Sequence, residues 1–252
     1  MKYPRVIAFA LLVGLLLLWE AAVPAFKFSA LVLPAPSAIG AALWRGLLTG
    51  YLWPHIAQTL LELGLGLALG VLLGFAGGVL LGESAALRRV LMPYVVTSQV
   101  VPKLALVPLF IVWFGFGTVP TVVITALICF FPLLENTLTA VAQVDAARLE
   151  LFRMLGASRW QTLWRLKVPA GLPAILAGLR VAMVLALVGA VVGKFIGASR
   201  KLGTLIIAAQ ASMDTALMFA ALLLITALGL LLYEAALLLE RYLLKPYSQS
   251  SN

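Results

Sequence analysis

Few residues of this 252-residue chain have side chains that could perform catalysis or hold a metal ion. The sequence contains one histidine, His55, and one cysteine, Cys129, so it offers neither a conventional Ser/His/Asp arrangement nor a Cys/His zinc cluster. The nine acidic residues are scattered, and only Asp145 and Glu150 lie close together in a polar segment. We therefore expect no enzyme activity, no metal site and no cofactor on this chain.

The polar segment that contains these two acids covers residues 143–173 and is rich in basic residues. Asp145 can cap a helix that ends near Leu155, because the following Gly156 allows a left-handed turn at little cost. A second helix, over residues 158–167, is expected to stop before Pro169. Two short helices would form a rigid protrusion for docking a cytoplasmic partner, although an ordinary amphipathic loop fits the spacing equally well.

The composition places the remaining chain in a membrane. Hydrophobic residues make up 63% and charged residues 11% of the sequence, and the mean hydropathy is +1.11. Soluble domains are roughly 45–50% apolar and about 25% charged, so lipid must cover this chain. The net charge of +9 is spread over several loops and forms no basic run with aromatic residues, which argues against nucleic-acid binding.

Continuous apolar windows predict transmembrane helices, because about 20 helical residues cross the roughly 30 Å core of a bilayer. Six windows qualify: residues 6–23, 56–81, 90–115, 119–141, 172–196 and 216–239. Most Lys and Arg residues fall in segments that are cytoplasmic if both termini lie inside, so we predict that orientation. The prediction is thus one all-α domain over residues 1–252, whose first window is an uncleaved anchor.

Two of these windows have unusual residues. In the second, glycine recurs at every fourth position and predicts a seam for close helix packing: Gly66, Gly70, Gly74, Gly78 and Gly82. The third contains Pro93, Pro102 and Pro108, which remove backbone donors and bend a helix. Bent helices at membrane depth are buried in protein or line a cavity, which favours a transport path over a purely structural kink.

Shorter elements are expected outside the spans. Ser37 can cap a helix over residues 38–48, and residues 197–215 should form a loop followed by a short surface helix. His55 is expected at the membrane interface, and Cys129 is expected to pack inertly in an apolar run.

Ionisable residues within the windows are candidates for function. Lys103 could line a path or extend to the interface, and these two interpretations weigh equally. Lys194 would lie at the outer mouth, where Arg200 and Lys201 could help it favour an anion, unless it forms a local ion pair or contacts lipid headgroups. Other ionisable residues are expected in inter-helix pairs or at interfaces: Glu62, Arg180 and Glu234.

Within the polar segment, five residues have a specific spacing: Glu150, Gly156, Leu166, Val168 and Pro169. The spacing resembles the loop of bacterial ABC importer permeases, in which Glu-Ala-Ala, three residues, Gly and nine residues precede Ile-x-Leu-Pro. Asp145-Ala146-Ala147 is out of register with that loop. Leu151 and Phe152 occupy the two alanine positions, which departs from the pattern.

The resemblance extends over nearly the whole chain. Several segments are similar to permeases for nitrate, sulfonates and taurine: Trp19-Glu20, residues 33–37, 102–110, 113–115 and 130–132, and Asn136-Thr137. Residues 213–215 and 218–220 are more similar to permeases for thiamine-pyrimidine precursors and riboflavin. The chain is identified as a member of this branch, and the substrate stays open among these solutes.

Such a resemblance implies a type I importer permease of the bacterial inner membrane. It would work as two identical or similar copies with two cytoplasmic ATPase subunits and an external binding protein. ATP and magnesium would bind to the ATPase chain, because this sequence lacks Gly-x-x-x-x-Gly-Lys-Ser/Thr. The coupling loop, residues 143–168, would contact the ATPase through six residues: Glu150, Arg153, Gly156, Ala157, Ser158 and Arg159. The candidate path residues are Gln99, Pro102, Lys103, Asn136 and Lys194.

Two other classes of protein compete with this interpretation. An ATP-independent channel or secondary transporter would need an ion relay and inverted repeats, and no convincing repeat is visible. A membrane enzyme would need acids or histidines clustered near an interface.

Overall fold

The computed structural model describes residues 3–192 and 201–248, and all regular structure in these ranges is helical. The predicted all-α class is therefore confirmed. The helices are α1 (Tyr3–Ala25), α2 (Pro36–Leu48), α3 (Leu52–Glu83), α4 (Ala85–Val100), α5 (Val107–Phe114), α6 (Thr118–Ala142), α7 (Ala146–Met154), α8 (Arg159–Thr162), α9 (Val168–Val192), α10 (Leu202–Ala211) and α11 (Thr215–Ser248). A 3-10 turn (Lys103–Leu106) precedes α5, and a π-helical turn (Leu163–Lys167) joins α8 to α9.

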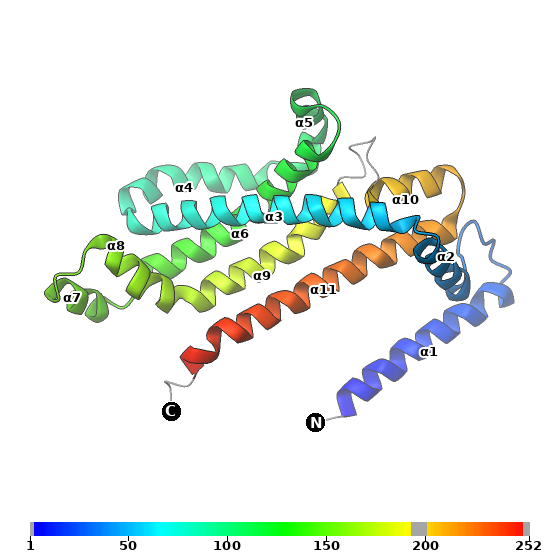
Figure 1. The fold of residues 1–252 in the computed structure, drawn as a ribbon, viewed down its shortest axis with the longest axis horizontal. Helices are drawn as coiled ribbons and strands as arrows, with labels where there is room; N and C mark the ends of the chain where they lie inside the picture. Colours follow the sequence, from blue (N-terminus) through cyan, green and yellow to red (C-terminus); the bar gives the residue numbers. More distant parts are fainter. Residues whose placement is uncertain (1–2, 193–200, 249–252) are drawn as a thin grey trace.

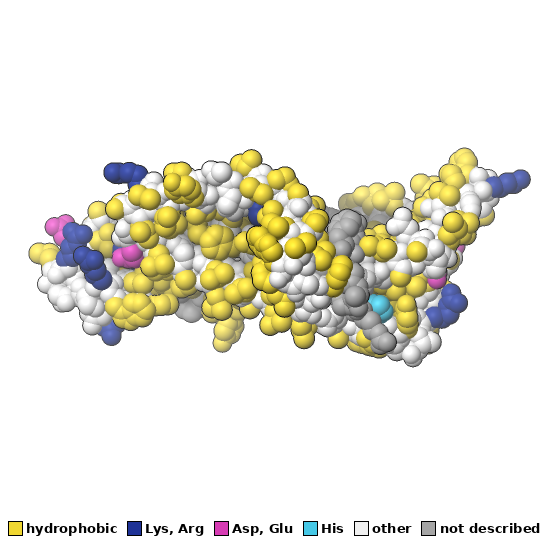
Figure 2. All heavy atoms as spheres, turned by 90° about the horizontal axis from the view of Figure 1, so that it is seen from above, with side chains coloured by type: hydrophobic (Ala, Val, Ile, Leu, Met, Phe, Trp, Pro, Cys, Tyr) yellow, Lys and Arg dark blue, Asp and Glu magenta, His cyan; other side chains and the backbone are white. Residues whose placement is uncertain are grey.

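The long helices α3, α6, α9 and α11 run along the long axis of the molecule, with α7 and α8 at one end and α2 and α10 at the other (Figure 1). Figure 2 shows that charged side chains on the visible face lie mainly toward these two ends, with an apolar surface between them. This distribution is what a bilayer requires, because charges are costly in its hydrocarbon core.

Four helical stretches of the described chain are long and apolar enough to cross a membrane: Leu52–Glu83, Thr118–Ala142, Arg159–Gly189 and Thr215–Lys245. The helices around the predicted third span form a fifth candidate, but they are bent by 83°. In α1, the continuously described apolar stretch Ala10–Ala25 is shorter than a span. The described residues thus hold up to five candidate spans, against the six predicted windows.

The bend in the third window is a complete break between α4 and α5. Val101 is extended (φ −65°, ψ 122°), which is the conformation that a following proline favours, and Pro102 then begins the 3-10 turn. Pro108 lies in the first turn of α5, where its missing N–H costs nothing, and Pro93 lies within α4. Of the three prolines, Pro102 therefore marks the break.

The centre of the fold is α6, which lies between α3 and α9. The glycine seam of α3 lies against α6, and a Cβ added at Gly70, Gly74 or Gly78 would come within 2.6–2.7 Å of an α6 carbonyl oxygen. On the other face of α6, Gly178 of α9 approaches Asn136 in the same way. Cys129 is fully buried in α6 and its Sγ donates to the Ala182 carbonyl at 3.2 Å, as expected for a packing residue.

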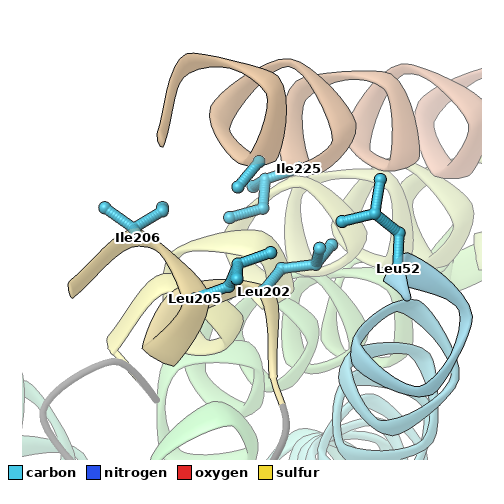
Figure 3. Close-up of a cluster of buried hydrophobic side chains, with 6 residues drawn as sticks. Leu52, Leu202, Leu205, Ile206 and Ile225 are labelled. Carbon is cyan, nitrogen blue, oxygen red and sulfur yellow. The ribbon is translucent and has the colours of Figure 1, made fainter. Parts of the chain in front are cut away.

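At the opposite end from α7, α10 is packed into the bundle. Leu202, Leu205 and Ile206 of α10 form a buried cluster with Leu52 of α3 and Ile225 of α11 (Figure 3). The expected short helix is therefore present, with one face buried and the other, which includes Gln210, exposed. The apolar residues at spacings of three and four turn inward because α11 and α3 are close enough to cover them.

The connection between α1 and α2 also differs from the expectation. Ala35, not Ser37, is the N-cap of α2. Ser37 lies in the first turn, where its N–H and Oγ donate to the Glu20 carboxylate at 2.9 and 2.6 Å. Glu20 thus supplies from α1 the acceptor that the exposed N–H groups of a helix start require.

Candidate functional site

The end of the molecule formed by α7 and α8 is held by three local hydrogen-bond motifs. Asp145 begins α7 by accepting from the Ala147 N–H at 3.0 Å. At the end of α7, Gly156 adopts φ 69°, and the Ala157 N–H donates to the Phe152 carbonyl at 3.0 Å, which is a Schellman motif. Ser158 then starts α8 with a capping box to Gln161. These contacts fix the turn that the sequence predicted.

The predicted stop of the second helix before Pro169 is wrong. The helix continues from α8 through the π-helical turn into α9, with the Val168 N–H donating to the Leu163 carbonyl. Proline offers no N–H to the preceding turn, and the wider turn accommodates this loss without ending the helix. As a result, α8 is the start of the same apolar stretch that contains α9.

The α7–α8 end, defined here as residues 145–162, presents both charged and apolar side chains. The residues expected to contact an ATPase are exposed at this end, except that Ala157 is half-buried: Glu150, Arg153, Gly156, Ala157, Ser158 and Arg159. Beside them, Met154, Leu155 and Trp160 are 83%, 73% and 68% exposed. Large apolar side chains among charged ones, beyond the apolar body of the bundle, are typical of a protein-protein contact.

An ion pair ties the base of the α7–α8 end to the bundle. Lys167 Nζ lies 2.7 Å from Glu83 Oε1 at the end of α3, and both side chains are partly covered. By contrast, Arg148 and Asp145 are 4.0 Å apart and largely exposed, so their attraction contributes little. A cleft of about 810 Å³ lies between the end of α3 and the α7–α8 end, with Arg153 and Arg159 among its lining residues.

The break between α4 and α5 brings three of the predicted path residues together. Lys103 Nζ donates to Gln99 Oε1 at 2.7 Å, and Pro102 lies between them at the break. No residue of α4 is fully buried within the described chain. Met92 and Val95 pack against Leu81, Leu134 and Leu138, while the opposite face of α4 is open to another molecule or to lipid.

Asn136 occupies a different environment from these three residues. Its Nδ2 donates to the Pro132 carbonyl at 2.8 Å, and its Cβ lies at the close contact with Gly178 of α9. Lys194 and Arg200 lie outside the described residues.

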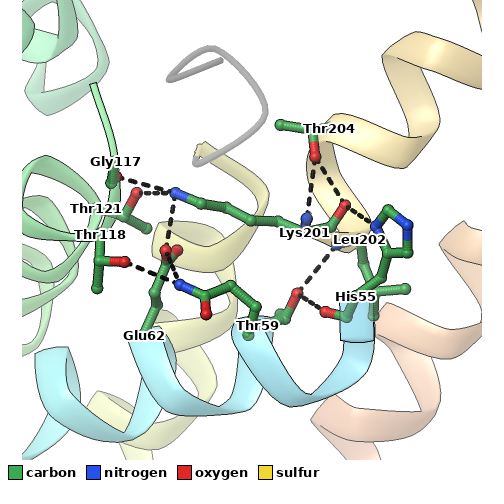
Figure 4. Close-up of polar contacts among 10 residues, drawn as sticks. His55, Thr59, Glu62, Gly117, Thr118, Thr121, Lys201, Leu202 and Thr204 are labelled. Atoms are coloured by element: carbon green, nitrogen blue, oxygen red, sulfur yellow. Dashed lines mark hydrogen bonds and ion pairs between the residues drawn. The ribbon is translucent and has the colours of Figure 1, made fainter. Parts of the chain in front are cut away.

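A buried polar network at the α2–α10 end was not recognised from the sequence (Figure 4). Lys201 and Glu62 form an ion pair of 2.9 Å, with 1% and 2% of their side chains exposed. The expectation that Lys201 helps to attract an anion at the outer mouth is therefore wrong, because its charge is buried and paired. The expectation of an inter-helix pair holds for Glu62, and also for Arg180, whose Nη2 lies 3.3 Å from Glu240 of α11.

His55 also belongs to this network, and its side chain is buried. It is 9% exposed, and its Nδ1 lies 3.1 Å from the Lys201 carbonyl, which requires the proton on Nδ1 because a carbonyl only accepts. A sequence signal was present: His55, Gln58, Thr59 and Glu62 are polar at spacings of three and four on an otherwise apolar helix.

In the described ranges, apolar helices long enough to cross a membrane lie between two ends that carry most of the visible charges. Among the residues with described positions, no three His, Cys, Asp or Glu side chains gather to hold a metal ion. Apolar helices of span length, one broken candidate span and a polar end with exposed apolar side chains are the features of a multi-pass membrane protein.

Comparison with known proteins identifies the family. The family described as "Binding-protein-dependent transport system inner membrane component" matches residues 66–245, and the chain belongs to it. The chain is 37% identical over 224 residues to a probable ABC transporter permease protein of Haemophilus influenzae, covering 88% of this chain and 91% of that protein. It is also 37% identical over 231 residues to the riboflavin transport system permease protein RibX of Chloroflexus aurantiacus, covering 92% and 86%.

Other relatives, at 31–34% identity, are named as permeases for aliphatic sulfonates, formylaminopyrimidine and taurine. The predicted branch of the family is therefore confirmed. Among solved structures, a chain of the MetNI methionine ABC transporter in an inward-facing form superposes with a TM-score of 0.67 at 20% identity, covering 76% of this chain and 95% of that chain. The two chains share their fold.

Proposed function

We propose that this chain is the permease subunit of an ATP-driven importer, and that the α7–α8 end is where it receives its driving force from a cytoplasmic ATPase. The observation that carries the proposal is the exposure of Met154, Leu155 and Trp160 on two short, capped helices outside the apolar bundle. A docked protein would cover these side chains, while Glu150 and the neighbouring arginines would set its orientation. The nucleotide chemistry would reside on that other chain.

The connections of the α7–α8 end support a mechanical role. A displacement of α8 would pass to α9 through the continuous helix, and the Lys167–Glu83 pair would pass part of it to α3. Because α3, α6 and α9 are in close contact, both inputs would reach the same three helices. Closure of two ATPase subunits could therefore drive alternating access by rigid-body movement.

The proposed membrane arrangement has six spans with both termini inside the bacterial inner membrane. The spans would be α1, α3, the broken α4–α5 pair, α6, α8–α9 and α11. The family description supports an inner-membrane location, and the excess of basic residues in the proposed cytoplasmic segments supports the orientation.

The translocation path would lie beside α4, where a second, identical or similar copy of the chain would cover its unburied side chains. Gln99, Pro102 and Lys103 would line the path at the break, and the Lys103–Gln99 hydrogen bond would open when solute enters. Asn136 and Lys194 remain candidates for lining this path.

The solute would be small and would arrive on an extracytoplasmic binding protein. The relatives' names support two classes: sulfonate- or taurine-type anions, and riboflavin or a thiamine-pyrimidine precursor. Since Lys201 is paired with Glu62, an anion would find its positive charge elsewhere. Calorimetry of the cognate binding protein with taurine, an alkanesulfonate, nitrate, formylaminopyrimidine and riboflavin separates these solutes.

The role of the α7–α8 end is tested by reversing one charge. Glu150→Arg places a cation beside Arg153 at the proposed contact, so capture of the cognate ATPase by the purified chain should fall about tenfold or more. The matched control is Arg45→Glu, an equally exposed charge reversal on α2, at the far end of the molecule. The control should capture the ATPase as the wild type does.

The same experiment separates the importer from other transport classes. Equal capture by the wild type, Glu150→Arg and Arg45→Glu would contradict docking at the α7–α8 end. Solute uptake that persists in proteoliposomes without ATP hydrolysis would instead assign the chain to channels or secondary transporters.

A further inference from the structure

The buried network at the α2–α10 end contains an ammonium group whose hydrogen-bonding capacity is fully used. Lys201 Nζ donates to Glu62 Oε1 at 2.9 Å, to Thr121 Oγ1 at 2.8 Å and to the Gly117 carbonyl at 3.1 Å. A lysine has three N–H donors, and each has an acceptor here (Figure 4). The geometry is therefore that of a specific, fully hydrogen-bonded contact and not of a solvent-exposed lysine.

The backbone beside Lys201 is held by the same helix that supplies Glu62. The Lys201 carbonyl lies 3.1 Å from His55 Nδ1, and the Leu202 N–H donates to Thr59 Oγ1 at 3.0 Å. Thr59 in turn donates to the His55 carbonyl at 2.7 Å. One face of α3 thus binds the start of α10 in two ways. It contacts the backbone of Lys201 and Leu202, and it also contacts the Lys201 side chain.

The network also reaches the corner between α5 and α6. Gly117, with φ 138°, is the residue immediately before α6, and Thr121 lies in the first turn. Gln58 Nε2 adds a second link, because it donates to Glu62 Oε1 at 2.9 Å and to Thr118 Oγ1 at 2.8 Å. Three segments that are distant in sequence therefore meet at one carboxylate: the start of α3, the α5–α6 corner and the start of α10.

Stability alone does not account for burying these charges. A buried ion pair costs much of its attraction in lost hydration, and well-packed apolar side chains often stabilise a fold equally well. The adjacent cluster around Leu52 and Leu202 shows that apolar packing already joins α3 to α10. The charged pair adds a fixed geometry. Because the Lys201 ammonium group needs all three acceptors in place, it permits only one arrangement of the segments that carry them.

We propose that Lys201 and Glu62 are positioning residues that hold α10 and the α5–α6 corner in one arrangement against α3, and thereby set the outer end of the translocation path. Only the statement about the translocation path rests on the proposed function. The α5–α6 corner directly follows the broken α4–α5 pair, so its position determines where α5, the helix on the far side of the break, ends.

The positional claim is tested by distance measurement on the full chain in lipid nanodiscs. Spin labels go on Gln210→Cys of α10 and Val119→Cys of α6, both exposed, in a Cys129→Ser background. Removing one charge would leave its partner buried and unpaired and could prevent folding, so the test variant is the apolar double substitution Glu62→Leu with Lys201→Met. The control replaces a different inter-helix pair, by Arg180→Met with Glu240→Leu.

The expected result is the same distance distribution in the wild type and in the control, and a shifted or clearly broader one in the apolar double variant. An unchanged distribution in the folded double variant would overturn the proposal. This measurement needs no ATPase, binding protein or solute, so its outcome does not depend on the proposed function.

A second readout addresses transport. With the cognate ATPase and binding protein in proteoliposomes, the apolar double variant should capture ATPase normally but import about tenfold less solute per ATP hydrolysed, which is a typical size for coupling between distant sites. Wild-type import per ATP in this variant would overturn the link to the path. If the wild-type chain itself captured no ATPase, the proposed function would fail while the distance measurement still decided the positional role.

Discussion

The glycines of α3 allow its backbone to lie directly against the backbone of α6. Each removes a Cβ at the point where the backbone of α6 comes closest, and the nearest groups at Gly70, Gly74 and Gly78 are carbonyl oxygens of α6. A carbonyl oxygen cannot move aside as the tip of a flexible side chain can. Helix association in lipid relies on such close packing, because burial of apolar surface gives no advantage there.

Gly74→Ala should therefore force α3 and α6 apart. The added Cβ would lie 2.6 Å from the Phe130 carbonyl, and we expect overpacking to lower the free energy of unfolding by about 1–3 kcal/mol. The matched control is Gly64→Ala on the same helix, where the new Cβ meets nothing within 4 Å. Thermal denaturation in detergent should show a loss for Gly74→Ala alone; equal behaviour of the two variants would contradict the seam.

Single polar residues were the hardest to interpret from sequence. In the sequence, Lys201 follows Gly197, Ser199 and Arg200 and has no helical pattern of its own, so its local sequence suggests solvent. Its burial depends on Thr121 and Glu62, which are 80 and 139 positions away and meet it only in the folded bundle. The polar face of α3 did contain the signal, because His55, Thr59 and Glu62 repeat at helical spacing.

Among the elements, the α7–α8 end shows which local rules can be read from sequence. The cap at Asp145 and the left-handed Gly156 depend on nearby residues, and both were predicted correctly. The cap at Ser158 was not predicted, although the second helix was expected to begin at that residue. The continuation of the helix from α8 through Pro169 into α9 was not predicted. A proline usually ends a helix, and only the packed bundle sustains the π-helical turn before it. At Pro102, by contrast, the sequence predicted a bend, and the structure has a complete break.

The turn at Gly156 gives a test at this scale. Gly156→Val should cost roughly 1–2 kcal/mol, because a β-branched residue disfavours the left-handed conformation, and the reoriented α8 should bind the ATPase about tenfold more weakly. Gly156→Asn should have a smaller effect, since asparagine tolerates φ 69° better. Titrated ATPase capture measures both.

Steric crowding does not complicate that comparison, because a Cβ at Gly156 meets nothing within 4 Å. Equal losses for the valine and asparagine variants would indicate that the ATPase contacts the Gly156 position directly, and would argue against a conformational role for the turn.

The whole molecule has two chemically distinct ends separated by an apolar body. One end carries the α7–α8 helices, and the other carries α2, α10 and the buried Lys201–Glu62 pair (Figure 1). Composition alone predicted the apolar body, and the repeated glycines predicted that it is a packed bundle. The angle between α4 and α5 and the packing of α10 required three-dimensional contacts that no local pattern encodes.

The proposed orientation makes the two ends accessible from opposite sides. In a Cys129→Ser background, Gln210→Cys on α10 should react with a membrane-impermeant maleimide in intact spheroplasts, since both termini are proposed to lie inside. Gln143→Cys, at the end of α6, should react only after permeabilisation. Both positions are exposed, so burial does not bias the comparison. The reverse labelling pattern would contradict the orientation.

The glycine seam also determines how the central helices can slide. With glycine at every fourth position, equivalent contacts between α3 and α6 recur only after a translation of about 6 Å, from the rise of 1.5 Å per residue. Any smaller offset would push a larger side chain of α3 against a carbonyl that now faces a glycine. The three helices α3, α6 and α9 therefore resist shear and would move as one stiff plate, so that bending during a transport cycle would fall on the peripheral segments: the α4–α5 break, α1 and α11.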